Sequence, residues 1–82
     1  MNKEMMVKNL DRCCKLDRDL DIVIQFKNPN KETLSKVTEL KHRLKKIKEK
    51  VDKSEGISDF SEIITESLGL MASQAELIKD IL

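Results

Sequence analysis

The sequence predicts an all-α protein, in which an antiparallel helical hairpin is extended to a small three-helix bundle with coiled-coil-like seams. Apolar side chains return every third or fourth residue along most of the chain. Two clusters of helix-breaking residues, at 27–30 and 54–56, separate three amphipathic segments. The 82 residues have room for one domain, residues 1–82. Its predicted helices cover 2–26, 30–54 and 58–81, and their short connections favour antiparallel neighbours.

The first predicted helix, 2–26, carries one broad apolar stripe, whose spacing averages the period of a straight helix and not a strict heptad. Cys13 lies on this stripe and Cys14 lies beside it. Ile22 and Phe26, one helical turn apart, point away from the stripe, so another surface must cover them. The stripe consists of Met6, Leu10, Cys13, Leu16, Leu20 and Ile24.

Pro29 separates the first two helices, because proline disfavours helical geometry in the residue before it. Asn28 or Asn30 can cap the second helix. That helix has a narrow seam with two apolar positions per heptad, which is typical of a coiled coil or a slender bundle. Since the flanks of the seam are mostly basic, we expect an acidic neighbour. The seam consists of Val37, Leu40, Leu44, Ile47 and Val51.

The third predicted helix, 58–81, is mostly acidic and has two apolar stripes. Gly56 can end the preceding helix and Ser58 can cap this one, whereas Gly69 weakens its interior. The second stripe is centred roughly 110–120° around the helix from the main one, at about 100° per residue. The main stripe consists of Ile57, Phe60, Ile64, Leu68, Met71, Ala75, Ile78 and Leu82, and the second of Ile63, Leu70, Leu77 and Ile81.

Two apolar patches exceed what a three-helix core requires, and exposed apolar patches usually mark interfaces. The candidate partner-binding residues are therefore Ile63, Leu70, Leu77 and Ile81 on the third helix, with Ile22 and Phe26 on the first. The alternative interpretation is that both patches complete the internal core. We expect the chain to hold a partner helix, or a second copy of itself, through the second stripe of the third helix.

Residues that could support catalysis or hold a cofactor are scarce. With only two glycines, the chain lacks the glycine-rich loops that bind phosphates. His42 lies on an outer helical face among lysines, and the adjacent Cys13 and Cys14 are more simply explained as small apolar residues. We therefore expect no enzyme activity, catalytic residue, metal, cofactor or small-molecule substrate.

The cysteine usage and the hydropathy pattern predict a cytoplasmic protein, or a nuclear one if the source is eukaryotic. Two adjacent cysteines rarely bridge to each other, so a secreted disulfide scaffold is not expected. Apolar runs without glycine never exceed three residues, which is far short of a membrane span or a signal peptide.

A basic stretch in the second helix suggests an alternative function. Lys41, Arg43, Lys45 and Lys48 could bind phosphate groups, as in a small nucleic-acid-associated regulator. The net charge of +1 and the absence of stacking aromatic residues in this stretch argue against that function. A protein partner is therefore expected rather than a nucleic acid.

The function expected from these patterns is that of a non-catalytic helical protein-binding module, such as an adaptor, an assembly subunit or a small dedicated chaperone. In size and helical-hairpin character the chain resembles the small co-chaperones of bacterial type III secretion subunits. It is equally similar to subunits of eukaryotic coiled-coil assemblies. This resemblance covers architecture and implies no role for any single residue. A homodimer without another partner is a third possibility.

Overall fold

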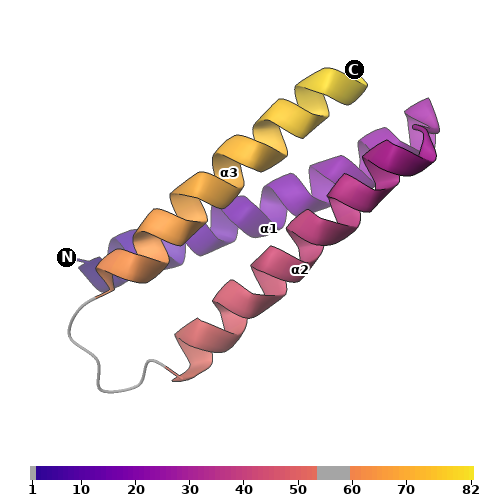
Figure 1. Ribbon diagram of the computed structural model, residues 1–82. Coiled ribbons are helices and arrows are strands. Elements are labelled where there is room, and N and C mark those ends of the chain that lie inside the picture. The colour runs from indigo at the N-terminus through magenta and orange to yellow at the C-terminus, as the bar shows by residue number, and fades with distance from the viewer. Residues whose placement is uncertain (1, 54–59) are drawn as a thin grey trace.

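The computed structural model describes residues 2–53 and 60–82, and its three helices form a bundle with no strand in those ranges (Figure 1). The helices are α1 (Asn2–Lys27), α2 (Lys31–Lys53) and α3 (Ser61–Ile81). The bundle measures 43 × 18 × 15 Å along its principal axes. The all-α three-helix prediction is confirmed, whereas Gly56 and Ser58 lie outside the described residues.

The connection between α1 and α2 uses the two asparagines in different ways. Asn28 ends α1: its N–H still donates a helical hydrogen bond to the carbonyl oxygen of Ile24 at 3.0 Å, and its left-handed backbone (φ 48°) then turns the chain away from the helix. Asn30 begins α2, because its Oδ1 accepts a hydrogen bond from the backbone N–H of Thr33 at 2.9 Å. Pro29 lies between them, so the turn requires only three residues outside the helices.

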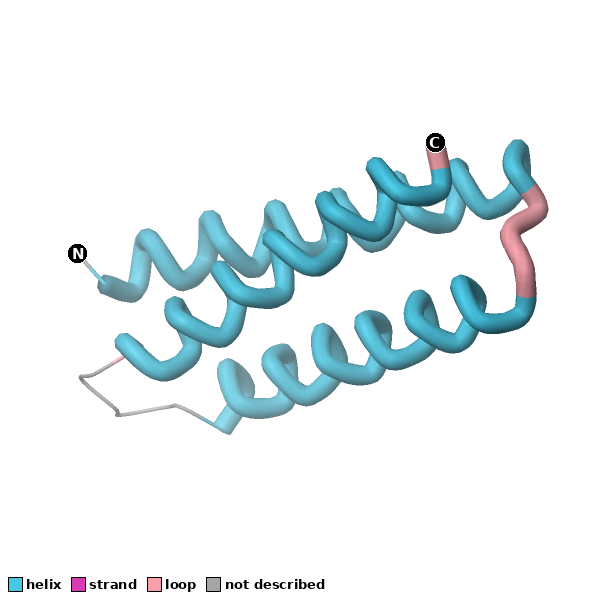
Figure 2. Tube along the Cα trace, turned by 45° about the horizontal axis from the view of Figure 1, so that its top comes forward, coloured by secondary structure: helices cyan, strands magenta, loops and turns pink. Residues whose placement is uncertain are grey.

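The order of the helices places α1 and α3 side by side and parallel, with α2 returning antiparallel to both (Figure 2). The packing is unequal, because α1 contacts α3 much more extensively than it contacts α2, its neighbour in sequence. The pair that resembles a hairpin in sequence is therefore the loosest pair in space. α3 forms the main contact with both other helices.

The core follows the predicted stripes of α1 and α2 closely. Met6, Cys13 and Leu20 of α1 are buried, at intervals of seven residues. The α2 seam is also confirmed, with its first four members buried and Val51 packed against the core. The buried apolar residues are Met6, Cys13, Leu20, Val37, Leu40, Leu44, Ile47, Ile63, Leu70 and Leu77.

The two stripes of α3 exchange the roles expected from the sequence. Leu70 is completely buried, Ile63 and Leu77 are buried, and Ile81 packs against the core. The prediction that these residues form a surface open to a partner is wrong for the bundle, because α1 and α2 already cover them. We call the buried stripe the inner seam; it consists of Ile63, Ser67, Leu70, Gln74, Leu77 and Ile81.

Ser67 and Gln74 explain why the apolar pattern predicted the wrong core face for α3. They occupy buried positions of the inner seam and complete a regular 4-3-4-3-4 spacing. Since both are polar, a search for apolar residues finds gaps at these positions and favours the wider apolar stripe as the core face. Asn9 is likewise a buried polar residue in α1. In the part of the chain that the structure describes, no helix is long and apolar enough to span a membrane.

Candidate functional site

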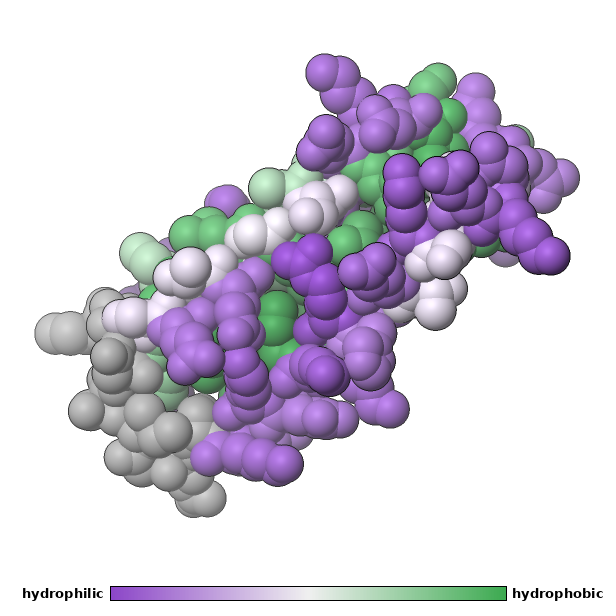
Figure 3. Space-filling model, in the orientation of Figure 1, coloured by the Kyte–Doolittle hydropathy of each residue, from purple (hydrophilic) through white to green (hydrophobic). Residues whose placement is uncertain are grey.

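An apolar row follows α3 on the side turned away from α2. We call it the outer seam; it consists of Ile64, Leu68, Met71, Ala75, Ile78 and Leu82. Leu68 and Leu82 are 53% and 71% exposed, while Ile64, Met71 and Ile78 are half-buried against the core. No member carries a charge. In the view of Figure 3, hydrophilic side chains cover α2, whereas hydrophobic and near-neutral residues follow α3.

The adjoining side of α1 extends this apolar surface. Ile22 and Phe26 are 51% and 81% exposed, so the prediction that they lie outside the core is confirmed. Ile22 lines a shallow surface hollow of about 400 Å³ together with Ala75 and Ile78 of the outer seam. The hollow is completed by Leu16, Asp19 and Val23 of α1. The structure thus joins one predicted patch to a stripe that the sequence assigned to the core.

The four predicted anion-binding residues do not form one cationic surface. Lys41 donates to Asp17 at 2.9 Å and lies 2.8 Å from Asp21, so two carboxylates of α1 offset its charge. Arg43 turns to the opposite flank of α2, where its Nη1 donates to the Ser73 hydroxyl at 3.4 Å. Lys45 and Lys48 are exposed.

Ion pairs fix α2 against both of its neighbours. Lys50 pairs with Glu62 and Glu66 of α3, as expected for a basic helix beside an acidic one. These hydrogen bonds, first to Glu66 and then to Glu62, raise the pKa of the Lys50 ammonium above its ordinary value. The pairing of Lys41 with α1 was not expected from the sequence, because the acidic residues of α1 were not assigned to a face.

Partial burial alone would lower the pKa of the Lys41 ammonium. The hydrogen bonds to Asp21 and Asp17 outweigh that effect and raise the pKa. Both lysines therefore remain charged at neutral pH and act as cross-links between helices.

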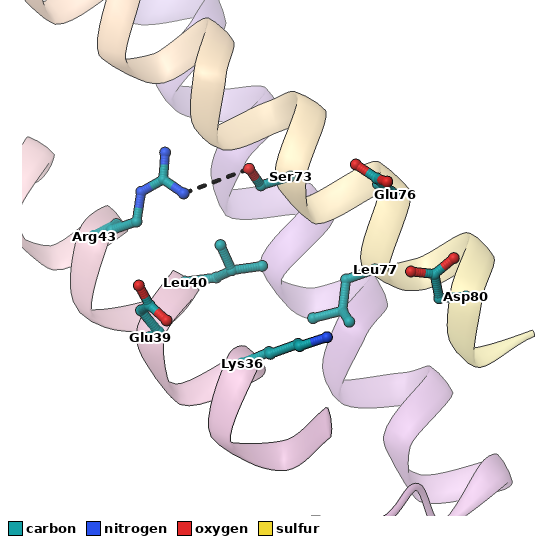
Figure 4. Close-up of a pocket in the computed structure, with 8 residues that line it drawn as sticks. All are labelled: Lys36, Glu39, Leu40, Arg43, Ser73, Glu76, Leu77 and Asp80. Carbon is teal, nitrogen blue, oxygen red and sulfur yellow. Dashed lines mark hydrogen bonds between the residues drawn. The ribbon is translucent and has the colours of Figure 1, made fainter. Parts of the chain in front are cut away.

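A polar hollow of about 260 Å³ lies between α2 and α3 near the start of α2 (Figure 4). Leu40 and Leu77 line its apolar part, while Arg43 reaches across to Ser73. The remaining lining residues are Lys36, Glu39, Glu76 and Asp80, so with Arg43 the hollow carries two cations and three carboxylates. This hollow is an ionic flank of the helix pair, and its residue types suit packing of α2 against α3 rather than selection of one ligand charge.

Cys13 is a core residue whose thiol is held in its neutral form. Its Sγ donates to the carbonyl oxygen of Ser67 at 3.5 Å, and the side chain is fully buried. Burial, with a smaller effect from Cys14, raises the pKa of the Cys13 thiol to about 11. His42 is exposed. Within residues 2–53 and 60–82, no three metal-ligating side chains gather in a way that could hold a metal ion.

No protein-family model, no curated protein and no solved structure matches this chain. The outer seam with its α1 flank is the candidate site, because it exposes apolar side chains without a charge in the seam.

Proposed function

We propose that this protein is a non-catalytic helix-binding module, whose outer seam and neighbouring α1 residues pack against an apolar face of another helical element. The observation that carries the proposal is the uninterrupted row of six uncharged residues along α3, bordered by the exposed Ile22 and Phe26. A helix with apolar residues at every third or fourth position would fit such a surface.

The charge distribution supports the same function. Two lysines on the flanks of α2, Lys41 and Lys50, are engaged inside the bundle by carboxylates of α1 and α3. The outer seam has no charged member, so desolvating it costs little. Binding there would depend mainly on apolar burial and would survive moderate salt. An adaptor, an assembly subunit or a small chaperone would each use such a face.

Photo-crosslinking in cells of the source organism tests this function. A photoreactive amino acid at Leu68 is expected to crosslink to a protein, since this outer-seam side chain is half exposed. The matched control carries the same group at Lys45, which is exposed on α2. Crosslinking at both positions equally, or at neither, would refute the outer seam as a binding surface.

A further inference from the structure

We infer that the partner of this face is a second copy of the chain, packed antiparallel across a two-fold axis. This inference rests on the helix-binding function and names its occupant. On α1, Met5, Arg12, Asp19 and Phe26 are spaced by seven residues, so they form a nearly straight row along one side of the helix. Arg12 and Met5 line one shallow hollow, and Asp19 lines the hollow shared with the outer seam.

This row of α1 is complementary to the same row of a second copy that runs in the opposite direction. When a second α1 runs in the opposite direction, Arg12 meets Asp19 of the other copy, and Met5 meets Phe26. Two ion pairs and two sulfur–aromatic contacts would therefore form at once. Arg12 and Asp19 are both exposed, and neither forms an ion pair within the described residues.

A parallel two-fold arrangement would not satisfy these charges. It would place α1 of one copy opposite α3 of the other, so Arg12 and Asp19 would face the uncharged outer seam. Removing two charges from water without partners is costly. Lys8 and Lys15 share the row of Ile22 on α1, at intervals of seven residues, at the edge of this face, where their long side chains can reach solvent in either arrangement. The charge pattern thus selects the antiparallel arrangement.

The outer seam of α3 is also symmetric under reversal. Its 4-3-4-3-4 spacing has its midpoint at residue 73, so Ile64 would meet Leu82, Leu68 would meet Ile78, and Met71 would meet Ala75. An antiparallel copy therefore pairs apolar residues with apolar residues along the whole of α3. Contacts of this kind supply the affinity, while the charges set the direction.

The same two-fold axis serves both helices. Cys13 lies level with the stretch between Ser67 and Gln74, because it hydrogen-bonds to both residues. The midpoint of the α1 row lies two to three residues beyond Cys13. Because parallel helices rise equally, by about 1.5 Å per residue, this point is level with about residue 73 of α3. The two midpoints, found independently on α1 and α3, coincide.

The exposed surface is sufficient for such a dimer. The chain exposes 5977 Å², whereas a compact monomer of 9.5 kDa exposes about 5,000 Å². The surplus is roughly 1,000 Å² and is similar to the ~800 Å² that each partner loses in a standard interface. Packing along the long side of the bundle would remove it.

Charge reversal provides a test that depends on direction. Sedimentation equilibrium of the purified full chain should give a dimer, and either Arg12→Asp or Asp19→Arg alone should raise its dissociation constant about tenfold, because two attractive contacts become repulsive. An equimolar mixture of the two variants should recover the unaltered affinity, since every reversed residue then meets an opposite charge. Lys45→Asp, on the exposed side of α2, is the matched control and should leave the affinity unchanged.

Recovery in the mixture supports the antiparallel dimer, whereas a dimer without recovery overturns the proposed pairing. A chain that remains monomeric at high micromolar concentration, with circular dichroism showing intact helices, also overturns it. In that case a crosslink from position 68 to a different protein would leave the helix-binding function standing. Absence of any crosslink from position 68 would refute the helix-binding function, independently of the dimer.

Discussion

Gln74, in the middle of α3, donates a hydrogen bond from its Nε2 to the backbone carbonyl oxygen of Cys13 in α1 at 3.0 Å. Gln74 is almost completely buried, and its Oε1 has no hydrogen-bond partner among the residues that the structure describes. The hydrogen bond aligns α1 with α3, while the unpaired oxygen is destabilising. A polar residue in an otherwise apolar seam commonly fixes the alignment of helices at a cost in stability.

Replacing Gln74 with leucine should therefore stabilise the bundle by about 1 kcal/mol, because the unpaired buried oxygen disappears and the volume is nearly kept. Gln74→Ala should destabilise it by about 2–3 kcal/mol, since it leaves a cavity. Urea unfolding followed by circular dichroism measures both changes. A clear loss of stability in Gln74→Leu would show that the hydrogen bond to Cys13 outweighs the cost of the buried oxygen.

Alanine substitutions at Leu68 and Leu70 form a matched pair of variants that distinguishes the outer seam from the core. Leu70→Ala should destabilise the chain by about 2–5 kcal/mol, because it creates a cavity among residues that are fully buried. Leu68→Ala should change the stability of the monomer by less than about 1 kcal/mol, because that side chain is half exposed. Unfolding at low protein concentration, below the range of self-association, makes the comparison. Equal losses in the two variants would contradict the assignment of the two seams.

The sequence was sufficient to predict three helices, their approximate ends and the core faces of α1 and α2, because apolar periodicity and the Asn28–Asn30 break act locally. It was not sufficient to assign the faces of α3. Ser67 and Gln74 are tolerated in the core because each makes a hydrogen bond there, to the carbonyl oxygens of Ile64 and Cys13. The hydrogen bond between Gln74 and Cys13 joins residues far apart in sequence, so residue type and spacing do not reveal it. The inner and outer seams share the same 4-3-4-3-4 spacing, so spacing alone did not distinguish them, and the wholly apolar outer seam was taken for the core face.

Cys13 should make the bundle less stable at high pH. Its pKa in the folded chain is about 11, against 9.0 for an ordinary thiol. Between these values the unfolded chain loses the thiol proton while the folded chain retains it. The stabilisation that the neutral Cys13 thiol contributes is therefore complete below pH 9 and is lost as the pH rises toward 11.

Urea unfolding of the unaltered chain and of Cys13→Ala, measured from pH 7 to pH 11, isolates this effect. The difference in stability between the two proteins should shrink as the pH rises above 9. A Cys14→Ala variant serves as the control for the neighbouring, half-buried cysteine. A difference that stays constant over this range would contradict a neutral, buried Cys13 thiol.

Gly69 offers a direct route to a more stable chain. It lies on the exposed side of α3, within the helix, and glycine there costs about 1 kcal/mol relative to alanine. A Cβ at this position would meet only the Nη2 atom of Arg43, at 3.9 Å, which is an ordinary contact. Gly69→Ala should therefore stabilise the bundle by about 1 kcal/mol in thermal or urea unfolding. Ala72→Gly, at another exposed position of α3, should cost a similar amount. A destabilised Gly69→Ala variant would mean that Arg43 cannot stay beside Ser73 when a methyl group is added.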